Sequence, residues 1–174
     1  MKITVIGYSG AGKSTLSGML SQIYGCPVLY LDRVQFEPGW KERDREEARR
    51  QVQEFLDRES SWIIDGNYQA FWQKRRLEEA DQILFFDFSR GRCLYQALKR
   101  YFGNIGTVRE SAADGCEEKI DLEFILWILW KGRTKEKRGH YREILREYPK
   151  KCVVLKKRKD VRRWLLRMEE KEQL

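Results

Sequence analysis

The sequence predicts an α/β fold, in which helices cover both faces of a parallel sheet. Three observations lead to this class. Short apolar runs typical of buried strands recur along the chain, segments with helical spacing lie between them, and the first run enters a glycine-rich turn that opens a helix. With 174 residues and no visible linker or repeat, we expect one domain over residues 1–174.

The first part of the chain contains two expected strands and two expected helices. Residues 2–7 form an apolar run ending in glycine and predict a strand, and residues 13–24 follow as a helix. Residues 28–31 predict a second short strand. Asp44 with Glu47 resembles a capping box and opens the next helix.

The third and fourth strands are expected at residues 61–65 and 82–87, which are again short apolar runs. Ser89 then caps a helix that closes at Gly103. Residues 103–119 are irregular and polar, and a loop of this length without evident structure is often functional.

The last part of the chain is expected to be mostly helical. A strongly apolar helix is predicted at residues 121–130, and a further helix carries Tyr141 and Ile144 on its inner face. Residues 152–155 predict a fifth strand, and Asp160 caps the final helix.

Composition excludes several classes of protein. Hydrophobic residues make up 41% and charged residues 36% of the chain, which is typical of a folded, soluble protein. The apolar run at residues 124–130 is too short to cross a bilayer, so we expect a cytoplasmic protein with no membrane partner. The four cysteines form no CxxC pair, and structural zinc is not expected.

The chain is basic, with a formal net charge of +8 and a pI near 9.3. Such a balance attracts polyanions, either nucleotides or nucleic acids. Basic clusters at residues 131–142 and 156–163 lie on or beside predicted helices, where a solvated outer face is the favoured interpretation. His140 is expected at a solvated surface position, and no recognised DNA-reading motif is present.

The glycine-rich turn is the most specific signal. Residues 7–14, GYSGAGKS, match the phosphate-binding pattern G-x-x-x-x-G-K-[ST] at every fixed position, between a strand and a helix. Glycines let the backbone turn tightly, so that successive N–H groups and the positive end of the helix dipole face an anion. The pattern therefore predicts that ATP, with Mg²⁺, binds here.

Each residue of this loop has an expected role. Lys13 supplies a mobile cation for the β- and γ-phosphates and counts as catalytic, the Ser14 hydroxyl is a magnesium ligand, and Thr15 bonds a phosphate nearer the sugar. The remaining nucleotide-binding positions supply backbone: Gly7, Ser9, Gly10, Ala11 and Gly12.

A second acidic residue is expected near the metal. Asp65 and Asp87 both end apolar runs, and Asp65 is favoured because Gly66 after it permits close approach to a ligand. Asp87 is the alternative, and it could instead start the turn into the helix capped by Ser89.

An acceptor site is expected where the second and third strands end, since ligands of open α/β sheets bind outside the carboxyl ends of the strands. Asp32 could orient or deprotonate an acceptor hydroxyl, which makes it a catalytic candidate, and Arg33 could bind an anionic group. Trp40 could stack on a ring or pack into the core. Gly66 and Asn67 are further candidates for contact with the acceptor.

Phosphoryl transfer also needs positive charge over the phosphates as the transition state develops. Arg100 ends a predicted helix and Arg109 lies in the irregular segment after it. We expect both to act there as catalytic residues if that segment folds over the nucleotide, and each is otherwise a solvated surface residue.

The chain resembles the DNA topology modulation (FlaR-related) family of P-loop proteins, within the adenylate-kinase-like superfamily. The resemblance spans nearly the whole chain and rests on GYSGAGKSTL, LDRVQFEPGW, WIIDGNY, ADQILFFDF, CLYQALKRY, DGCEEKIDLEF and VVLKKRKDV. It implies a five-stranded parallel sheet in the order 2-3-1-4-5, with ATP binding and a lid-like insertion at about residues 103–140.

The same resemblance implies roles for individual residues. The third strand lies beside the first in this superfamily, which would place Asp65 next to the phosphate loop. A lid arginine contacts the transferred phosphate, and Arg100 and Arg109 occupy that stretch here. Adenylate kinases carry Gly-Phe-Pro-Arg after the third-strand aspartate, whereas this chain has Gly66, Asn67 and Tyr68, so the acceptor stays open.

The leading hypothesis is an ATP-dependent kinase that phosphorylates a small acceptor such as a nucleoside, a nucleotide or a hydroxylated metabolite. One alternative is a nucleic-acid-associated NTPase that affects DNA topology, motivated by the net charge of +8. The other is a nucleotide-binding regulator without turnover.

Overall fold

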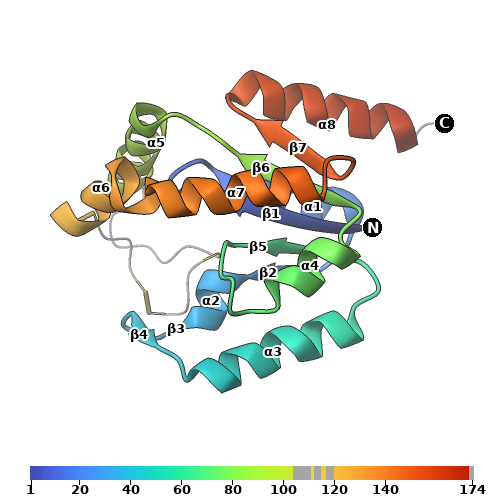
Figure 1. Ribbon diagram of the computed structural model, residues 1–174, viewed down its shortest axis with the longest axis horizontal. Coiled ribbons are helices and arrows are strands. Elements are labelled where there is room, and N and C mark those ends of the chain that lie inside the picture. The colour runs from blue at the N-terminus through green and yellow to red at the C-terminus, as the bar shows by residue number, and fades with distance from the viewer. Residues whose placement is uncertain (104–110, 112–114, 117–119, 173–174) are drawn as a thin grey trace.

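The computed structural model describes residues 1–103, 111, 115–116 and 120–172. Five parallel strands form the central sheet: β1 (Lys2–Gly7), β2 (Val28–Tyr30), β5 (Trp62–Asp65), β6 (Gln82–Phe86) and β7 (Cys152–Leu155). Their spatial order is β2-β5-β1-β6-β7, with β1 at the centre (Figure 1). Counted along the chain, this is the order 2-3-1-4-5, so the expected sheet is confirmed.

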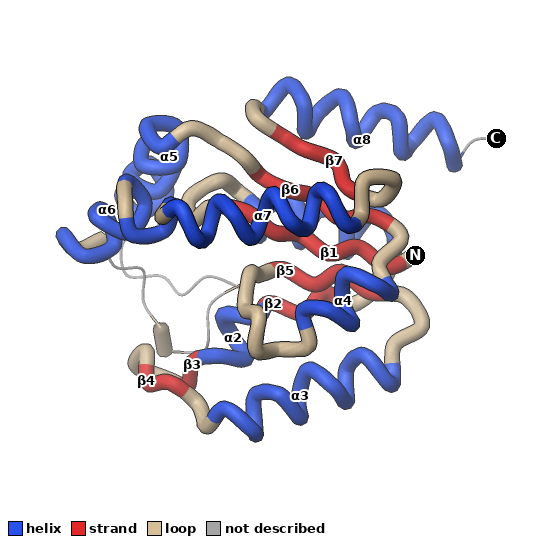
Figure 2. Tube along the Cα trace, in the orientation of Figure 1, coloured by secondary structure: helices blue, strands red, loops and turns tan. Residues whose placement is uncertain are grey.

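Helices cover both faces of this sheet: α7 lies in front of β1 and β6 (Figure 2), and α1 packs against β5, β1 and β2. The helices are α1 (Lys13–Tyr24), α2 (Leu31–Gln35), α3 (Arg45–Arg58), α4 (Gln73–Glu79), α5 (Arg90–Gly103), α6 (Leu122–Leu129), α7 (Lys135–Glu147) and α8 (Arg158–Glu172), with the 3₁₀ turn η1 (Lys131–Arg133). A small antiparallel hairpin joins β3 (Phe36–Glu37) to β4 (Lys41–Glu42). Within the described residues, no helix has the length and apolarity to cross a membrane.

The centre of the sheet is buried on both faces. Ile3, Val5, Ile63 and Leu84 are all 0% exposed. Burying an aliphatic side chain of this size contributes on the order of 1.5–3 kcal/mol. The continuous apolar runs seen in the sequence are therefore what a parallel sheet between two helical layers requires.

Most expected caps are present. The Asp44 carboxylate accepts hydrogen bonds from the backbone N–H groups of Glu46 and Glu47, at 3.1 and 3.0 Å. The Ser89 hydroxyl accepts one from Arg92, at 3.4 Å. Asp160 acts from inside the first turn of α8, where its carboxylate accepts hydrogen bonds from two preceding backbone N–H groups.

The second strand is shorter than expected, and the difference moves a site residue. It ends at Tyr30, and Leu31 begins α2, so Asp32 lies in the first turn of a helix and not at the end of a strand. Leu31 and Val34 are buried while Asp32 and Arg33 are exposed. This spacing is helical, but a helix of five residues is too short for the period to be recognised in sequence.

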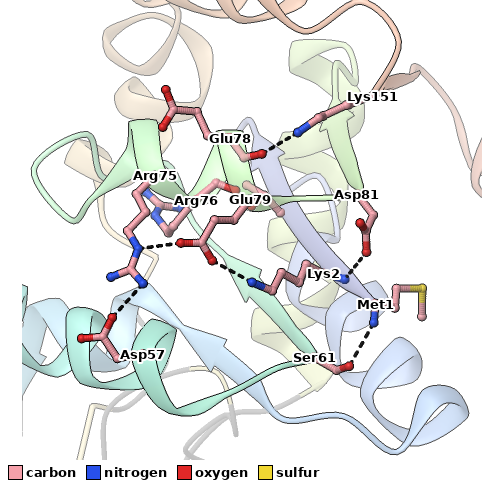
Figure 3. A network of polar contacts seen from close by, with 11 residues as sticks. Met1, Lys2, Asp57, Ser61, Arg75, Arg76, Glu78, Glu79, Asp81 and Lys151 are labelled. Carbon is pink, nitrogen blue, oxygen red and sulfur yellow. Dashed lines mark hydrogen bonds and ion pairs between the residues drawn. The ribbon is translucent and has the colours of Figure 1, made fainter.

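A network of polar contacts joins elements at the amino end of β1, opposite the end that carries the glycine loop (Figure 3). The Lys2 ammonium lies 2.8 Å from the Glu79 carboxylate, and the Arg75 guanidinium donates to Glu79 at 2.6 Å and to Asp57 at 2.7 Å. The backbone N–H of Lys2 also donates to Asp81, at 2.7 Å. These contacts attach α4 and α3 to the central strand.

Glu79 is the hub of this network, and its ionisation is coupled to folding. Burial by itself raises the pKa of Glu79, but hydrogen bonds from Lys2 and Arg75 outweigh it and hold the pKa below the ordinary value of 4.5. Because the folded-state pKa is the lower one, the stabilisation is complete above the unfolded-state pKa and is lost as pH falls through the folded-state pKa.

Replacing Glu79→Gln should therefore lower the free energy of unfolding at neutral pH by about 1 kcal/mol. The difference from the unmodified protein should shrink as pH falls below 4.5, because both proteins then carry a neutral group at this position. Urea unfolding across a pH series measures this. Glu54→Gln is the control, since Glu54 forms only a 3.8 Å surface pair with Arg50. If the loss of unfolding free energy in Glu79→Gln stays constant with pH, the ionisation of Glu79 is not coupled to folding as described.

Candidate active site

The glycine loop connects the carboxyl end of β1 to α1. Its glycines Gly7, Gly10 and Gly12 have φ values of 134°, 77° and 89°. A Cβ atom on Gly10 would lie 2.5 Å from the carbonyl oxygen of Cys93, so only glycine fits there. The loop closes on itself through a 3.2 Å hydrogen bond from Ala11 N–H to the Tyr8 carbonyl.

The amino end of α1 is open toward this loop. Gly12 occupies the N-cap position, no side chain caps the helix and no acidic residue lies in the first turn. By contrast, α3, α6 and α7 are capped by the side chains of Asp44, Asp121 and Thr134. The first backbone N–H groups of α1 therefore keep the positive end of the helix dipole available for an anion.

Lys13 and Ser14 stand at this open end. The Lys13 ammonium donates to the Tyr8 carbonyl at 3.2 Å, so the side chain folds back over the loop. Ser14 is half-buried and Thr15 is exposed. The proposed phosphate-binding residues thus lie together around one turn, although their roles stay predictions.

The carboxyl end of β1 is held on its β5 side by Asn67. The regular pairing of β5 with β1 stops at Asp65, opposite Val5, and the Gly66 N–H donates to the Val5 carbonyl at 3.1 Å. The Asn67 side chain then accepts a hydrogen bond from Gly7 N–H and donates one to the Gly7 carbonyl, both at 2.8 Å. Asn67 was expected to contact the acceptor, but the structure turns its amide toward the phosphate loop.

Gly66 allows the chain to leave the sheet at this point. It has φ 142°, and a Cβ atom there would lie 2.8 Å from the Leu31 Cβ. The segment that follows is held by Arg76, which is 0% exposed and donates to the carbonyls of Gly66, Tyr68 and Phe71 at 3.4, 2.7 and 2.8 Å. Burial lowers the pKa of the Arg76 guanidinium to about 9.

Asp32, for which the sequence predicts a role with the acceptor, lies beside the Tyr68 side chain. The Tyr68 hydroxyl donates to Asp32 Oδ1 at 2.8 Å. Burial, the charge of Asp32 and its hydrogen bond raise the pKa of Tyr68, and Glu42 and Asp65 raise it further. Asp32 and Asp65 therefore share one neighbourhood although 33 positions separate them (65 − 32). Tyr68 and Phe71 also line a cavity of about 260 Å³, whose lining residues do not include Asp32 or Asp65.

Arg33 and Trp40 lie elsewhere. Arg33 lines a separate cavity of about 380 Å³ with Tyr30, against the edge strand β2. The Trp40 ring packs edge-to-face on Phe36, with centroids 5.3 Å apart, and its backbone N–H donates to the Cys116 sulfur at 3.3 Å. The structure thus does not bring Arg33 and Trp40 to the cavity that Tyr68 lines.

Two carboxylates flank the central strand. Asp65 is 5% exposed at the end of β5, and Asp87 is half-buried after β6. Ser14 and Asp65 offer a hydroxyl and a carboxylate oxygen, which suit Mg²⁺, an ion that takes few protein ligands beside phosphates and water. Among the described residues, no group of three or more His, Cys, Asp or Glu could hold a metal ion without a substrate.

Cations from the C-terminal half of the chain reach the loop. The Arg133 guanidinium lies 3.6 Å from the centroid of the Tyr8 ring and donates to the Phe88 carbonyl at 2.7 Å. Burial and the charge of Asp87 raise the pKa of Tyr8, while the charges of Arg133, Arg138 and Arg90 lower it. Arg133 and Arg138 belong to the basic cluster expected on a solvated face, and for the buried Arg133 that expectation is wrong.

The apolar helix α6 also contacts the loop. The Trp127 indole N–H donates to the Ser9 hydroxyl at 3.2 Å, and the Lys137 ammonium lies 3.6 Å from the Trp127 ring centroid. Arg100 is half-buried in the last turn of α5. Arg109 lies outside the described residues. The lid-like interval expected at residues 103–140 includes α6 and η1, whose action as a lid stays a prediction.

No family model matches the chain, and no curated protein matches it in sequence. Its structure is similar to deoxyadenosine kinase from M. mycoides with bound dATP, at 16% identity and a TM-score of 0.56, covering 100% of both chains. Shikimate kinase from Bacteroides thetaiotaomicron matches at 19% identity and a TM-score of 0.52, covering 100% of this chain and 99% of that chain. TT1252 from Thermus thermophilus matches at 17% identity and a TM-score of 0.56, covering 98% and 97%. The chain therefore has an α/β fold that is shared with P-loop kinases.

Proposed function

We propose that this chain is an ATP-dependent phosphotransferase that moves the γ-phosphate of ATP to a small acceptor, namely a nucleoside, a nucleotide or a hydroxylated metabolite. The observation that carries the proposal is the open amino end of α1, which meets a glycine loop and Lys13. The fold shared with deoxyadenosine kinase and shikimate kinase supports it.

The phosphate side uses backbone and one lysine. The amides of the loop and of the first turn of α1 bind the phosphate oxygens, and Thr15 contacts a phosphate nearer the sugar. Lys13 leaves the Tyr8 carbonyl and moves its charge to the β- and γ-phosphates. No acidic side chain competes at the first turn of α1, so the site favours a polyanion.

Ser14 and Asp65 would hold Mg²⁺, which when bound neutralises charge on the phosphates. Asp87 is the alternative carboxylate, on the β6 side of β1. Asp65 is preferred because it belongs to the same group as Tyr68 and Asp32, on the acceptor side.

Asp32 acts on the acceptor. Tyr68 fixes one of its carboxylate oxygens at 2.8 Å, which leaves the other for the acceptor hydroxyl. As the acceptor oxygen forms its bond to the γ-phosphorus, the bond to the ADP oxygen breaks and the hydroxyl proton passes to Asp32. A hydroxyl is thus the chemical group that this side requires.

Arginines stabilise the charge that develops during transfer. Arg138 of α7 is exposed and within electrostatic reach of Tyr8, so it is a stronger candidate than Arg133, which is already bonded to the Phe88 carbonyl. Arg100 and Arg109 remain the candidates from the sequence.

The two alternatives give different outcomes in one experiment, an ATP-consumption screen over nucleosides, nucleotides and small hydroxylated metabolites, with and without DNA. A nucleic-acid-associated NTPase is motivated by exposed basic residues at the start of α8, and it would consume ATP only when DNA is added. A regulator would bind ATP without consuming it. ATP consumption that depends on one small acceptor supports the proposal. If the protein consumes no ATP with any acceptor in the screen, the proposal is contradicted.

Lys13→Ala should abolish acceptor-dependent ATP consumption, with a loss of at least about 100-fold, because the charge that follows the β- and γ-phosphates is gone. The far-UV circular dichroism and thermal midpoint should stay close to those of the unmodified protein. Lys74→Ala is the control, since the Lys74 side chain is 81% exposed on α4. Full turnover by Lys13→Ala would refute the assignment of the loop.

Asp32→Asn should reduce kcat for the acceptor that the screen identifies by about 100- to 10,000-fold, which is the usual contribution of a general base. ATP affinity, measured by calorimetry, should stay within about twofold of the native value, since Asp32 lies on the acceptor side. Asp57→Asn is the matched control at the opposite end of β1. Unchanged kcat in Asp32→Asn would remove the proposed role.

A further inference from the structure

Asn67 completes the hydrogen bonding of β1 at the point where β5 has left the sheet. On its other side, Gly7 is paired with Phe86 of β6 in the regular register. On the β5 side the regular pairing ends at Asp65, and beyond it the Asn67 side-chain amide makes two 2.8 Å hydrogen bonds to Gly7. A side-chain amide carries the same donor and acceptor as a peptide group, so it can substitute for one.

A second amide holds Asn67 in turn. Gln73 is 6% exposed in the first turn of α4, and its Nε2 donates to the Asn67 backbone carbonyl at 3.1 Å. Gln73 Oε1 lies 2.7 Å from Nε2 of His140, which belongs to α7. Because the carbonyl of Asn67 can only accept, the Gln73 amide orientation is determined, and His140 must donate from Nε2.

The half-buried His140 is therefore linked to the loop, and the expected solvated position is wrong. The chain of contacts runs from His140 through Gln73 and Asn67 to both backbone groups of Gly7. The next residue of α7, Tyr141, packs edge-to-face on Tyr8 with ring centroids 5.4 Å apart. Helix α7 is thus linked to Gly7 indirectly, through Gln73 and Asn67, and contacts Tyr8 directly through the Tyr141 ring.

We propose that Asn67 is a positioning residue for the phosphate loop, and that Gln73 and His140 transmit the position of α7 to it. The consequence for nucleotide affinity rests on the proposed function, whereas the consequence for the Gly7 backbone does not. In this role Asn67 touches no substrate. It sets the direction of the first peptide group of the loop, on which the directions of the later N–H groups depend.

The test measures amide hydrogen exchange by NMR in the ligand-free protein and ATP affinity by calorimetry. In Asn67→Ala, exchange at the Gly7 N–H should rise about tenfold or more, because its acceptor is lost. Exchange at Ile64, a fully buried position of β5, should change less than about twofold. ATP binding should weaken about tenfold.

Substitutions of other residues in this series of hydrogen bonds distinguish a positioning role from a general effect on stability. His140→Ala should raise Gly7 exchange and weaken ATP binding by a smaller factor, about two- to fivefold. The double variant Asn67→Ala/His140→Ala should be no worse than Asn67→Ala alone, because contacts in one network are not additive. Gln53→Ala, an exposed amide on α3, is the control and should change neither measurement.

Three results would overturn the proposal. They are unchanged Gly7 exchange in Asn67→Ala, an equal rise at Gly7 and Ile64, or fully additive effects of the Asn67 and His140 substitutions. If the unmodified protein binds no ATP, the proposed function fails, and the exchange measurement at Gly7 still decides the positioning role.

Discussion

The constraint on which the site depends is the position of the last residue of β1. Gly7 must pair on both sides to remain part of a buried sheet, yet the chain has to turn there into a loop with positive φ angles. β6 supplies one partner as a regular strand, and Asn67 supplies the other through its side chain. The loop therefore starts from a point held on both sides, which is what a backbone anion site requires, since its N–H groups must converge before the ligand arrives.

Charges are arranged differently at the two ends of β1. At the amino end, the Glu79 carboxylate lies within 3 Å of Lys2 and Arg75, Arg75 also pairs with Asp57, and these contacts attach helices to the sheet. At the carboxyl end, α1 has no side-chain cap and no acidic residue in its first turn. The amino end of β1 thus carries paired charges, whereas the first N–H groups of α1 keep the positive end of the helix dipole available for an anion.

One segment of the chain, residues 66–71, carries side chains to both sides of the proposed site. Arg76 is buried and holds the carbonyls of Gly66, Tyr68 and Phe71. From the backbone fixed in this way, Asn67 extends to the phosphate loop and Tyr68 extends to Asp32. Burying a guanidinium is costly, as its lowered pKa shows, and three carbonyl acceptors offset that cost. Neighbouring residues of one segment thus contact both the glycine loop and Asp32.

The sequence alone determined the features that depend on neighbours along the chain. The apolar strand runs, the glycine loop and the Ser89 cap were legible because residues close together along the chain define them, and the strand order followed from a family resemblance. Tertiary structure alone decided the direction of Asn67, the burial of Arg133 and the contact of His140 with Gln73. The side-chain hydrogen-bond partners of these three residues are 40 to 67 positions away in the sequence, and local spacing carries no information about which distant group a side chain meets. In a run of basic residues, the sequence does not distinguish a side chain that will be exposed from one that will be buried. Only the packing of the folded chain decides this.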